Sequence, residues 1–126
     1  MFDYSVKLII ITKDPEVVET AKKAFRLDED VHFFESWHEA LENCAGASLM
    51  FVDLVATLME PNRIAGYEKF AHAKMGHPVA SKVPLVLIAP PADYELDFMA
   101  GWPDFVFSHI RKPITDKIFR RVVTYI

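Results

Sequence analysis

The feature that most constrains the fold of this chain is a set of short segments in which apolar residues follow one another without alternating with polar ones. Lys7–Ile11, Ser48–Leu54 and Val83–Ala89 each contain a continuous apolar run. Strands that are buried on both faces have this pattern, which is typical of a parallel sheet covered by helices. Val31–Phe34 and Asp104–Ile110 also have strand character. We expect Val31–Phe34, which is short and begins beside an acidic turn, to be an edge strand.

Helical patterns lie between these strands. Asp14–Glu16 has the sequence Asp-Pro-Glu, which predicts a helix with Asp at the N-cap and Pro in its first turn. Ser36–Glu39 has the spacing of a capping box and predicts a second helix. Three more helices are predicted: Ile64–Met75, Asp93–Ala100 and one capped by Thr115 or Asp116.

The regular alternation of strand and helix predicts a parallel sheet with helices on both faces. We expect a single domain over residues 1–126, because the chain shows no linker, repeat or low-complexity tract. Val55–Arg63, which follows the third strand, is expected to be an irregular and longer connection.

Composition and charge exclude several classes of protein. The chain has 14 basic and 18 acidic residues and a net charge of −4, so a strongly basic nucleic-acid binder is excluded. Cys44 is the only cysteine, which excludes a disulfide framework and a cysteine-rich zinc site, and we expect it to be buried. The longest nearly apolar run, Val83–Ala92, is about half a membrane span. The N-terminus lacks the pattern of a secretory signal, so a cytoplasmic location without membrane attachment is expected.

Ligands of doubly wound sheets bind at the carboxyl ends of the strands. Eight residues follow or close the predicted strands at that edge. They are Thr12, Lys13, Asp14, Asp53, Ala89, Pro90, Lys112 and Pro113.

These strand ends resemble the receiver domain of bacterial two-component response regulators, and the resemblance covers the whole chain. Asp53 matches the family's phospho-accepting aspartate at the end of the third strand. Lys112-Pro113 matches its lysine–proline pair, Ser36–Leu41 resembles the start of its second helix, and Ala100-Gly101 resembles the pair before its fifth strand. The resemblance implies a five-stranded sheet of order 2-1-3-4-5, flanked by two helices on one face and three on the other.

Three features, at four positions, depart from the family pattern. Thr12 and Lys13 stand where the family has two acidic residues that help to hold Mg²⁺. Ala89 stands where the family has a Thr or Ser whose hydroxyl follows the phosphoryl group. His109 falls at the family's aromatic switch position on the fifth strand, and a satisfied strand residue is the alternative for it.

Transfer of a phosphoryl group to a carboxylate needs charge neutralisation, most of which a divalent metal supplies. Our hypothesis is that Lys13 occupies the place of the metal and keeps Asp53 ionised and unmodified, with Lys112 as a second cation. The two alternatives for Asp53 are a structural strand-end carboxylate and a residue that is still phosphorylated. Asp14 is expected to be a helix cap rather than a metal ligand. We expect Pro113 to follow a cis peptide bond, as the resemblance implies.

An aromatic cluster near the fourth helix and fifth strand is either core or a surface for a partner, since aromatic side chains are favoured at the centres of interfaces. The interface candidates are Phe98, Met99, Trp102, Phe105, Arg111 and Arg120. A second candidate docking site is the loop with Leu58 and Met59. His72 and His77 are five residues apart, a spacing that does not place both on one helix face, so no metal site is expected there.

The sequence thus favours a pseudo-receiver: a non-enzymatic module without cofactor or metal that binds other signalling proteins. A second copy of the chain is one candidate partner, through the face of the fourth helix, fifth strand and fifth helix. One alternative is a phospho-accepting receiver modified at Asp53, which would use Mg²⁺ in an unusual geometry. The other alternative is a flavodoxin-like binder of a small ligand, against which the lack of a phosphate-cradling glycine loop counts.

Overall fold

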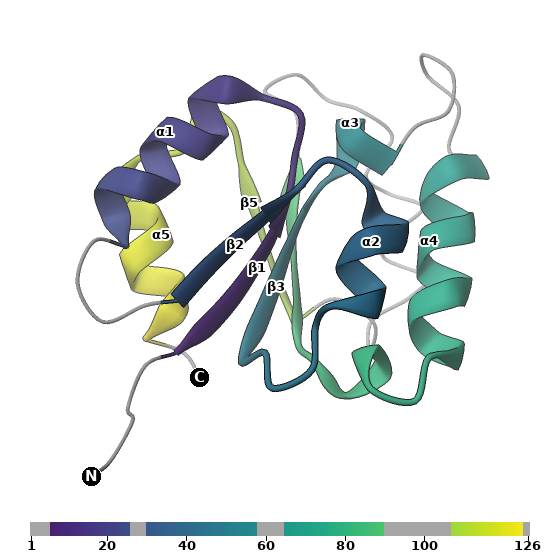
Figure 1. The fold of residues 1–126 in the computed structure, drawn as a ribbon. Coiled ribbons are helices and arrows are strands. Elements are labelled where there is room, and N and C mark those ends of the chain that lie inside the picture. The colour runs from purple at the N-terminus through teal and green to yellow at the C-terminus, as the bar shows by residue number, and fades with distance from the viewer. Residues whose placement is uncertain (1–5, 26–29, 58–64, 90–106, 125–126) are drawn as a thin grey trace, which may run out of the picture.

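A computed structural model describes residues 6–25, 30–57, 65–89 and 107–124, without the side chains of residues 65 and 67. Its five strands form one parallel sheet in the order β2-β1-β3-β4-β5 (Figure 1). The strands are β1 (Lys7–Ile11), β2 (Asp30–Phe34), β3 (Leu49–Asp53), β4 (Leu85–Ala89) and β5 (Ser108–Arg111). The predicted sheet and its strand order are therefore confirmed.

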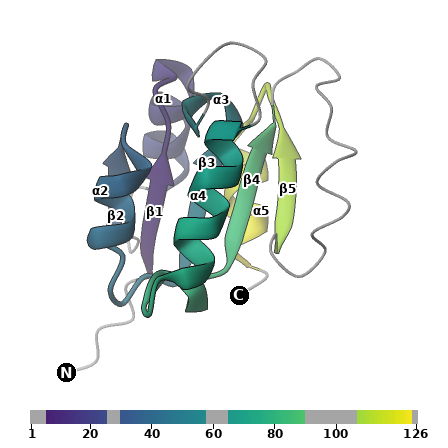
Figure 2. The ribbon, with the colours of Figure 1, turned by 90° about the vertical axis from the view of Figure 1, so that its right-hand side faces the viewer.

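The described helices cover both faces of the sheet. The helices α1 (Pro15–Ala24) and α5 (Asp116–Val123) lie side by side on one face. The other face carries α2 (Trp37–Glu42), α3 (Leu54–Thr57) and α4 (Ala65–Gly76), as Figure 2 shows. A short 3-10 turn, η1 (Ala80–Lys82), leads into β4.

Two hydrophobic layers form because neighbouring residues of a strand point to opposite faces. In β1, Ile9 and Ile11 join the layer under α2 and α4, whereas Leu8 and Ile10 join the layer under α1 and α5. Every residue of β3 and β4 is buried, but β2 and β5 are only partly so. The continuous apolar runs thus belong to the central strands, and the prediction that Val31–Phe34 lies at an edge is confirmed.

Local capping chemistry explains where two of the helices begin. Asp14 caps α1, where its Oδ1 accepts a hydrogen bond from the backbone N–H of Glu16 at 2.9 Å. Thr115 caps α5, and its hydroxyl accepts from the N–H of Ile118 at 3.2 Å. Ser36 does occupy the N-cap position of α2, but its side chain makes no capping hydrogen bond. The predicted capping box is therefore wrong in its chemistry, although the helix starts where it was expected.

Several predicted boundaries need correction. Residues 54–57 form the helical turn α3 rather than an irregular start to the connection, because Thr57 Oγ1 donates to the Leu54 carbonyl and Asp53 accepts from the N–H of Val55. The fifth strand runs over Ser108–Arg111, so it starts later and ends one residue later than predicted. The predicted helix Asp93–Ala100 lies outside the described residues, as do Leu58 and Met59.

Two buried side chains lie in the layer under α2 and α4. Cys44 is fully buried, as expected, and its burial raises the pKa of its thiol. Lys74 of α4 is also buried, and its ammonium donates to the Val83 carbonyl at 2.7 Å. Burial lowers the pKa of Lys74, because desolvation disfavours its charged form.

Within the described parts of the chain, no helix combines the length and the apolar character that crossing a membrane requires.

Candidate functional site

Asp53 lies at the carboxyl end of β3, with only 1% of its surface exposed. Thr12, the residue after β1, donates its hydroxyl to Asp53 Oδ2 at 2.8 Å. The backbone N–H of Val55 donates to Asp53 Oδ1 at 3.2 Å. Both carboxylate oxygens therefore have a donor, as a buried carboxylate requires.

Lys112 completes the site from the segment after β5. Its ammonium nitrogen lies 2.9 Å from Asp53 Oδ2 and also 2.9 Å from Asp14 Oδ2. Its backbone N–H donates to the Ala89 carbonyl at 2.9 Å, which holds the start of this segment against the end of β4. The predicted ion pair between Lys112 and Asp53 is confirmed, and one ammonium joins the two carboxylates.

Asp14 has two roles at once. Its Oδ1 caps α1, as predicted, while its Oδ2 pairs with Lys112. Its backbone N–H donates to Thr12 Oγ1 at 3.0 Å, so the Thr12 hydroxyl is held on both sides. Sequence reasoning missed the ion pair of Asp14, although the position of this residue after β1, at the same edge as Lys112, was a usable signal.

Lys13 does not take the predicted place beside Asp53. Its side chain is exposed, and in the part of the chain that the structure describes it forms no ion pair. Neighbouring residues in an extended segment point to opposite sides, so Lys13 points away when Thr12 points toward Asp53. The cation of the site is Lys112, and the hypothesis that assigned Lys13 to it is wrong.

The paired charges shift two pKa values in the directions that stabilise the charged forms. The hydrogen bond from Lys112 lowers the pKa of Asp14, and the capping N–H of Glu16 adds to this effect. Burial by itself would lower the pKa of Lys112, but its hydrogen bonds to Asp53 and Asp14 outweigh burial and raise it. The charged forms of Asp14 and Lys112 are therefore favoured at neutral pH.

The lowered pKa of Asp14 predicts a pH-dependent loss of stability. A carboxyl group whose pKa is lower in the folded chain than in the unfolded chain stabilises the fold. This stabilisation is complete above the unfolded pKa of about 3.9, and it is lost as the pH falls through the pKa of the folded chain. We expect Asp14→Asn to lower the free energy of unfolding by about 1 kcal/mol at pH 7. The difference in free energy of unfolding between this variant and the unmodified protein should vanish at pH values below the pKa that Asp14 has in the folded chain.

Urea unfolding at a series of pH values measures this difference. Asp116→Asn, at an exposed carboxylate of α5, is the matched control and should change stability by less than about 0.5 kcal/mol. A difference for Asp14→Asn that stays constant into strong acid would contradict the role of its charge.

The remaining positions that the sequence singled out lie around this site. Ala89 is buried at the end of β4 and has no hydroxyl. Pro113 follows a cis peptide bond after Lys112, as expected. His109 lies on β5 with an exposed side chain, and its role as a switch stays a prediction. Pro90 lies outside the described residues.

Of the six interface candidates, the structure describes two. Arg111 on β5 and Arg120 on α5 are exposed. Arg120 also donates to the Ala24 carbonyl at 2.6 Å, which ties α5 to the end of α1. Phe98, Met99, Trp102 and Phe105 lie outside the described residues.

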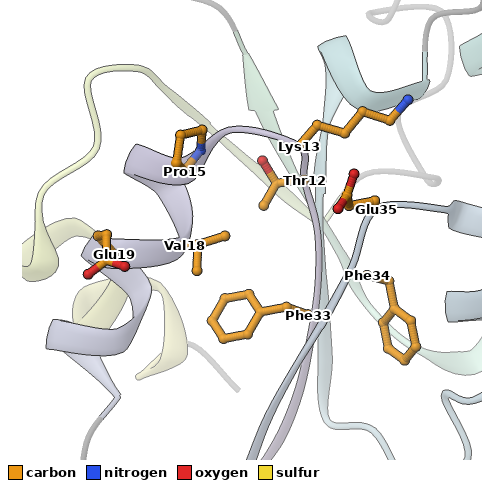
Figure 3. Close-up of a pocket in the computed structure, with 8 residues that line it drawn as sticks. All are labelled: Thr12, Lys13, Pro15, Val18, Glu19, Phe33, Phe34 and Glu35. Carbon is orange, nitrogen blue, oxygen red and sulfur yellow. The ribbon is translucent and has the colours of Figure 1, made fainter.

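A hollow of about 330 Å³ lies beside the site, between the start of α1 and the end of β2 (Figure 3). Val18 and Phe33 point toward one another across it, whereas Lys13 extends away from them. A second hollow, of about 580 Å³, is lined by Lys13, Glu35 and the stacked rings of Trp37 and His38. Both hollows mix apolar with polar and charged side chains.

Comparison with known proteins shows a likeness in structure only. No protein-family model matches the chain, and no curated protein matches it in sequence. A protein from Chloroflexus aurantiacus that is assigned to the response regulators has 18% identity and a TM-score of 0.72, with 95% of this chain and 96% of that chain covered. A receiver-domain protein from Clostridium thermocellum has 16% identity and a TM-score of 0.70, over 95% of this chain and 92% of the other.

The chemotaxis protein CheY4 of Vibrio cholerae has 13% identity and a TM-score of 0.73, with 96% of this chain and 98% of that chain covered. The likeness therefore extends over nearly the whole of each chain, although few side chains are shared. It agrees with the strand order of the sheet. The chain has the fold of the response-regulator receiver domains.

Proposed function

We propose that this chain is a receiver-like domain of bacterial signal transduction that binds a protein partner without being phosphorylated. The observation that carries the proposal is the position of the Lys112 ammonium, 2.9 Å from Oδ2 of both Asp14 and Asp53. The carboxylate that would accept a phosphoryl group is thus buried and already paired with a cation of the chain itself.

The residues around Asp53 do not fit the Mg²⁺ that the fold family implies. Magnesium prefers several hard oxygen ligands in octahedral geometry. The two positions that would supply carboxylates hold Thr12, whose hydroxyl bonds to Asp53, and Lys13, whose side chain is exposed. Asp14, a further acid among the described residues, caps α1 and pairs with Lys112. A divalent ion would therefore meet an ammonium between the two carboxylates.

Among the described residues, the end of β4 offers no hydroxyl that could report a phosphoryl group. A ligand shifts a conformational equilibrium only through contacts that differ between the two states. Ala89 has no hydroxyl that could follow the phosphoryl group from the end of β4. Both the transfer of a phosphoryl group to Asp53 and the conformational response to it are thus weakened. This supports a role of the fold in binding a partner rather than in phosphoryl transfer.

The partner surface that we propose includes the edge of the sheet at β5. This strand pairs on one side with β4 and is the last strand in the sheet order. Phe107, just before it, is 47% exposed, and the exposed Arg111 supplies charge on the same strand. Apolar side chains with arginine beside them are typical of interface centres and rims. We propose another signalling protein, or a second copy of the chain, as the partner.

The test of the proposal is exposure of the intact chain to acetyl phosphate with Mg²⁺, followed by intact-mass measurement. We expect no phosphoryl adduct above the level seen with Asp53→Asn. A persistent adduct on the unmodified chain that Asp53→Asn abolishes would overturn the proposal in favour of a phospho-accepting receiver. A known phospho-accepting receiver treated in parallel shows that the reagent is active.

A further inference from the structure

We propose that the chain pairs with a second copy of itself through α2 and α4, where an acidic surface on α2 of each copy meets a basic surface on α4 and η1 of the other. Four exposed charged side chains define these two surfaces. They are Glu39 and Glu42 on α2, Lys69 on α4 and Lys82 in η1. The two signs of charge are separated along the chain, because residues 27–62 contain no lysine or arginine and residues 69–92 contain no aspartate or glutamate.

The acidic surface lies on the side of α2 that points away from the sheet. Glu39 and Glu42 are three residues apart, a spacing that places both on one side of a helix. Ala40 and Leu41 of the same helix are buried in the core. The packing of α2 against the sheet therefore directs both carboxylates outward, where a second molecule can reach them.

The basic surface also offers apolar contact area. Lys69 is exposed on α4, whereas its neighbour Phe70 is fully buried. Met75, near the end of α4, is 49% exposed, and Val79, just before η1, is 39% exposed. Methionine is enriched in protein interfaces, whose rims are polar. The α4 side of the proposed interface therefore combines apolar side chains with the charges of Lys69 and Lys82.

The two surfaces lie next to one another on the same face of the molecule (Figure 1). Trp37 of α2 contacts Phe70 of α4 edge-on, with ring centres 5.7 Å apart. A two-fold rotation about an axis that runs between the two helices places α2 of each copy over α4 of the other. The two resulting contacts are identical, and each brings acidic side chains against basic ones. The face is thus complementary to itself, as the interface of a closed dimer must be.

Charge complementarity favours a second copy as the occupant of this face. A face of one sign would repel itself, whereas this face presents both signs side by side. Exposed ion pairs contribute little individually, so we expect a weak dimer, with a dissociation constant on the order of 100 μM. It should also depend on salt, because the screening length falls from about 10 Å at 0.1 M to about 3 Å at 1 M ionic strength.

Sedimentation equilibrium of the whole chain and of two charge-reversed variants tests the inference. The first variant combines Lys69→Glu with Lys82→Glu, and the second combines Glu39→Lys with Glu42→Lys. Each variant should self-associate at least about tenfold more weakly than the unmodified chain, because like charges then meet in both contacts. An equimolar mixture of the two variants should form dimers again, because an all-acidic face then meets an all-basic one.

Two controls separate this face from the rest of the surface. Lys22→Glu combined with Lys23→Glu changes the net charge as much as the first variant does, but at exposed lysines of α1, on the other face of the sheet. Arg111→Glu reverses an exposed charge on β5, which lies at the edge of the sheet away from α2 (Figure 2). Both controls should keep the dissociation constant of the unmodified chain within about twofold. Circular dichroism verifies that every variant is folded.

Three results would overturn the inference. They are an unmodified chain that stays monomeric at about 1 mM in 0.1 M salt, a dimer that persists in both reversed variants, and a mixture that associates no more tightly than either variant alone. A dimer that only Arg111→Glu disrupts would also overturn it and would place the second copy at β5. The proposed function fails separately, because a phosphoryl adduct on Asp53 would overturn it whatever the dimer does.

Discussion

Replacing Lys112 by methionine is expected to lower the free energy of unfolding by about 3 kcal/mol at neutral pH. The substitution keeps most of the apolar stem of the side chain but removes its charge. Asp53, with a 2% exposed side chain, then retains its bonds to Thr12 and Val55 but loses its counter-ion. Breaking a buried pair by removing one partner is costly because it leaves an uncompensated charge.

Urea unfolding of Lys112→Met and of Lys117→Met measures this effect. Lys117 is an exposed lysine in the first turn of α5, so its replacement should change stability by less than about 0.5 kcal/mol. If Lys112→Met lowers the free energy of unfolding by as little as the control does, the ammonium does not compensate the two carboxylates. A domain of this length has roughly 6–19 kcal/mol of stability, so the variant should stay folded.

Phe119→Ala is expected to lower the free energy of unfolding by about 4 kcal/mol. The Phe119 ring is fully buried and packs edge-on against Phe51 of β3, with ring centres 5.2 Å apart, and against Phe25, at 5.5 Å. Alanine would leave a cavity between α5, the sheet and the end of α1. Removal of buried aromatic atoms adds the cost of that cavity to the lost transfer free energy.

Thermal unfolding followed by circular dichroism measures this change. The melting temperature should fall by roughly 15 °C. Phe107→Ala, at a ring that is 47% exposed, is the matched control and should change stability by less than about 1 kcal/mol. Equal decreases in stability for Phe119→Ala and Phe107→Ala would contradict the assignment of Phe119 to the core that attaches α5 to the sheet.

The fold was predictable because its signals are local and repeated. Three strands contain continuous apolar runs because both of their faces are covered, and the strand order followed from the resemblance at the strand ends. Asp14 was recognisable as a cap because proline follows it, and the structure shows the expected bond to Glu16. The helical turn after Asp53 was missed because it depends on bonds to the Asp53 carboxylate and from the Thr57 hydroxyl, not on an apolar pattern.

The candidate site was predictable in its position but not in its pairings. The strand ends placed Thr12, Asp53 and Lys112 at one edge of the sheet, and the structure brings all three into contact. Which lysine pairs with Asp53 depends on which of the two neighbours, Thr12 or Lys13, points toward it after β1 has ended, and the sequence does not show this. Lys13 turns outward, and the long stem of Lys112 reaches across from another strand.

The burial of Lys74 was likewise beyond the sequence. A lysine on a helix is ordinarily exposed. Here its ammonium reaches the Val83 carbonyl just before β4, and this contact depends on how α4 and η1 pack together. Tertiary contacts of this kind have no counterpart in the local pattern of the chain.

The central claim is that the Asp53 site neither holds Mg²⁺ nor accepts a phosphoryl group, since the Lys112 ammonium already pairs with its two carboxylates. Amide NMR spectra of the chain, recorded with Mg²⁺ and then with Mg²⁺ and beryllofluoride as a phosphoryl mimic, test it most directly. The account predicts signals for residues 12–14, 53, 89 and 112 that do not shift in either step. Shifts around Asp53 with Mg²⁺, which spread to β5 once beryllofluoride is added, would contradict it and show a working phospho-receiver.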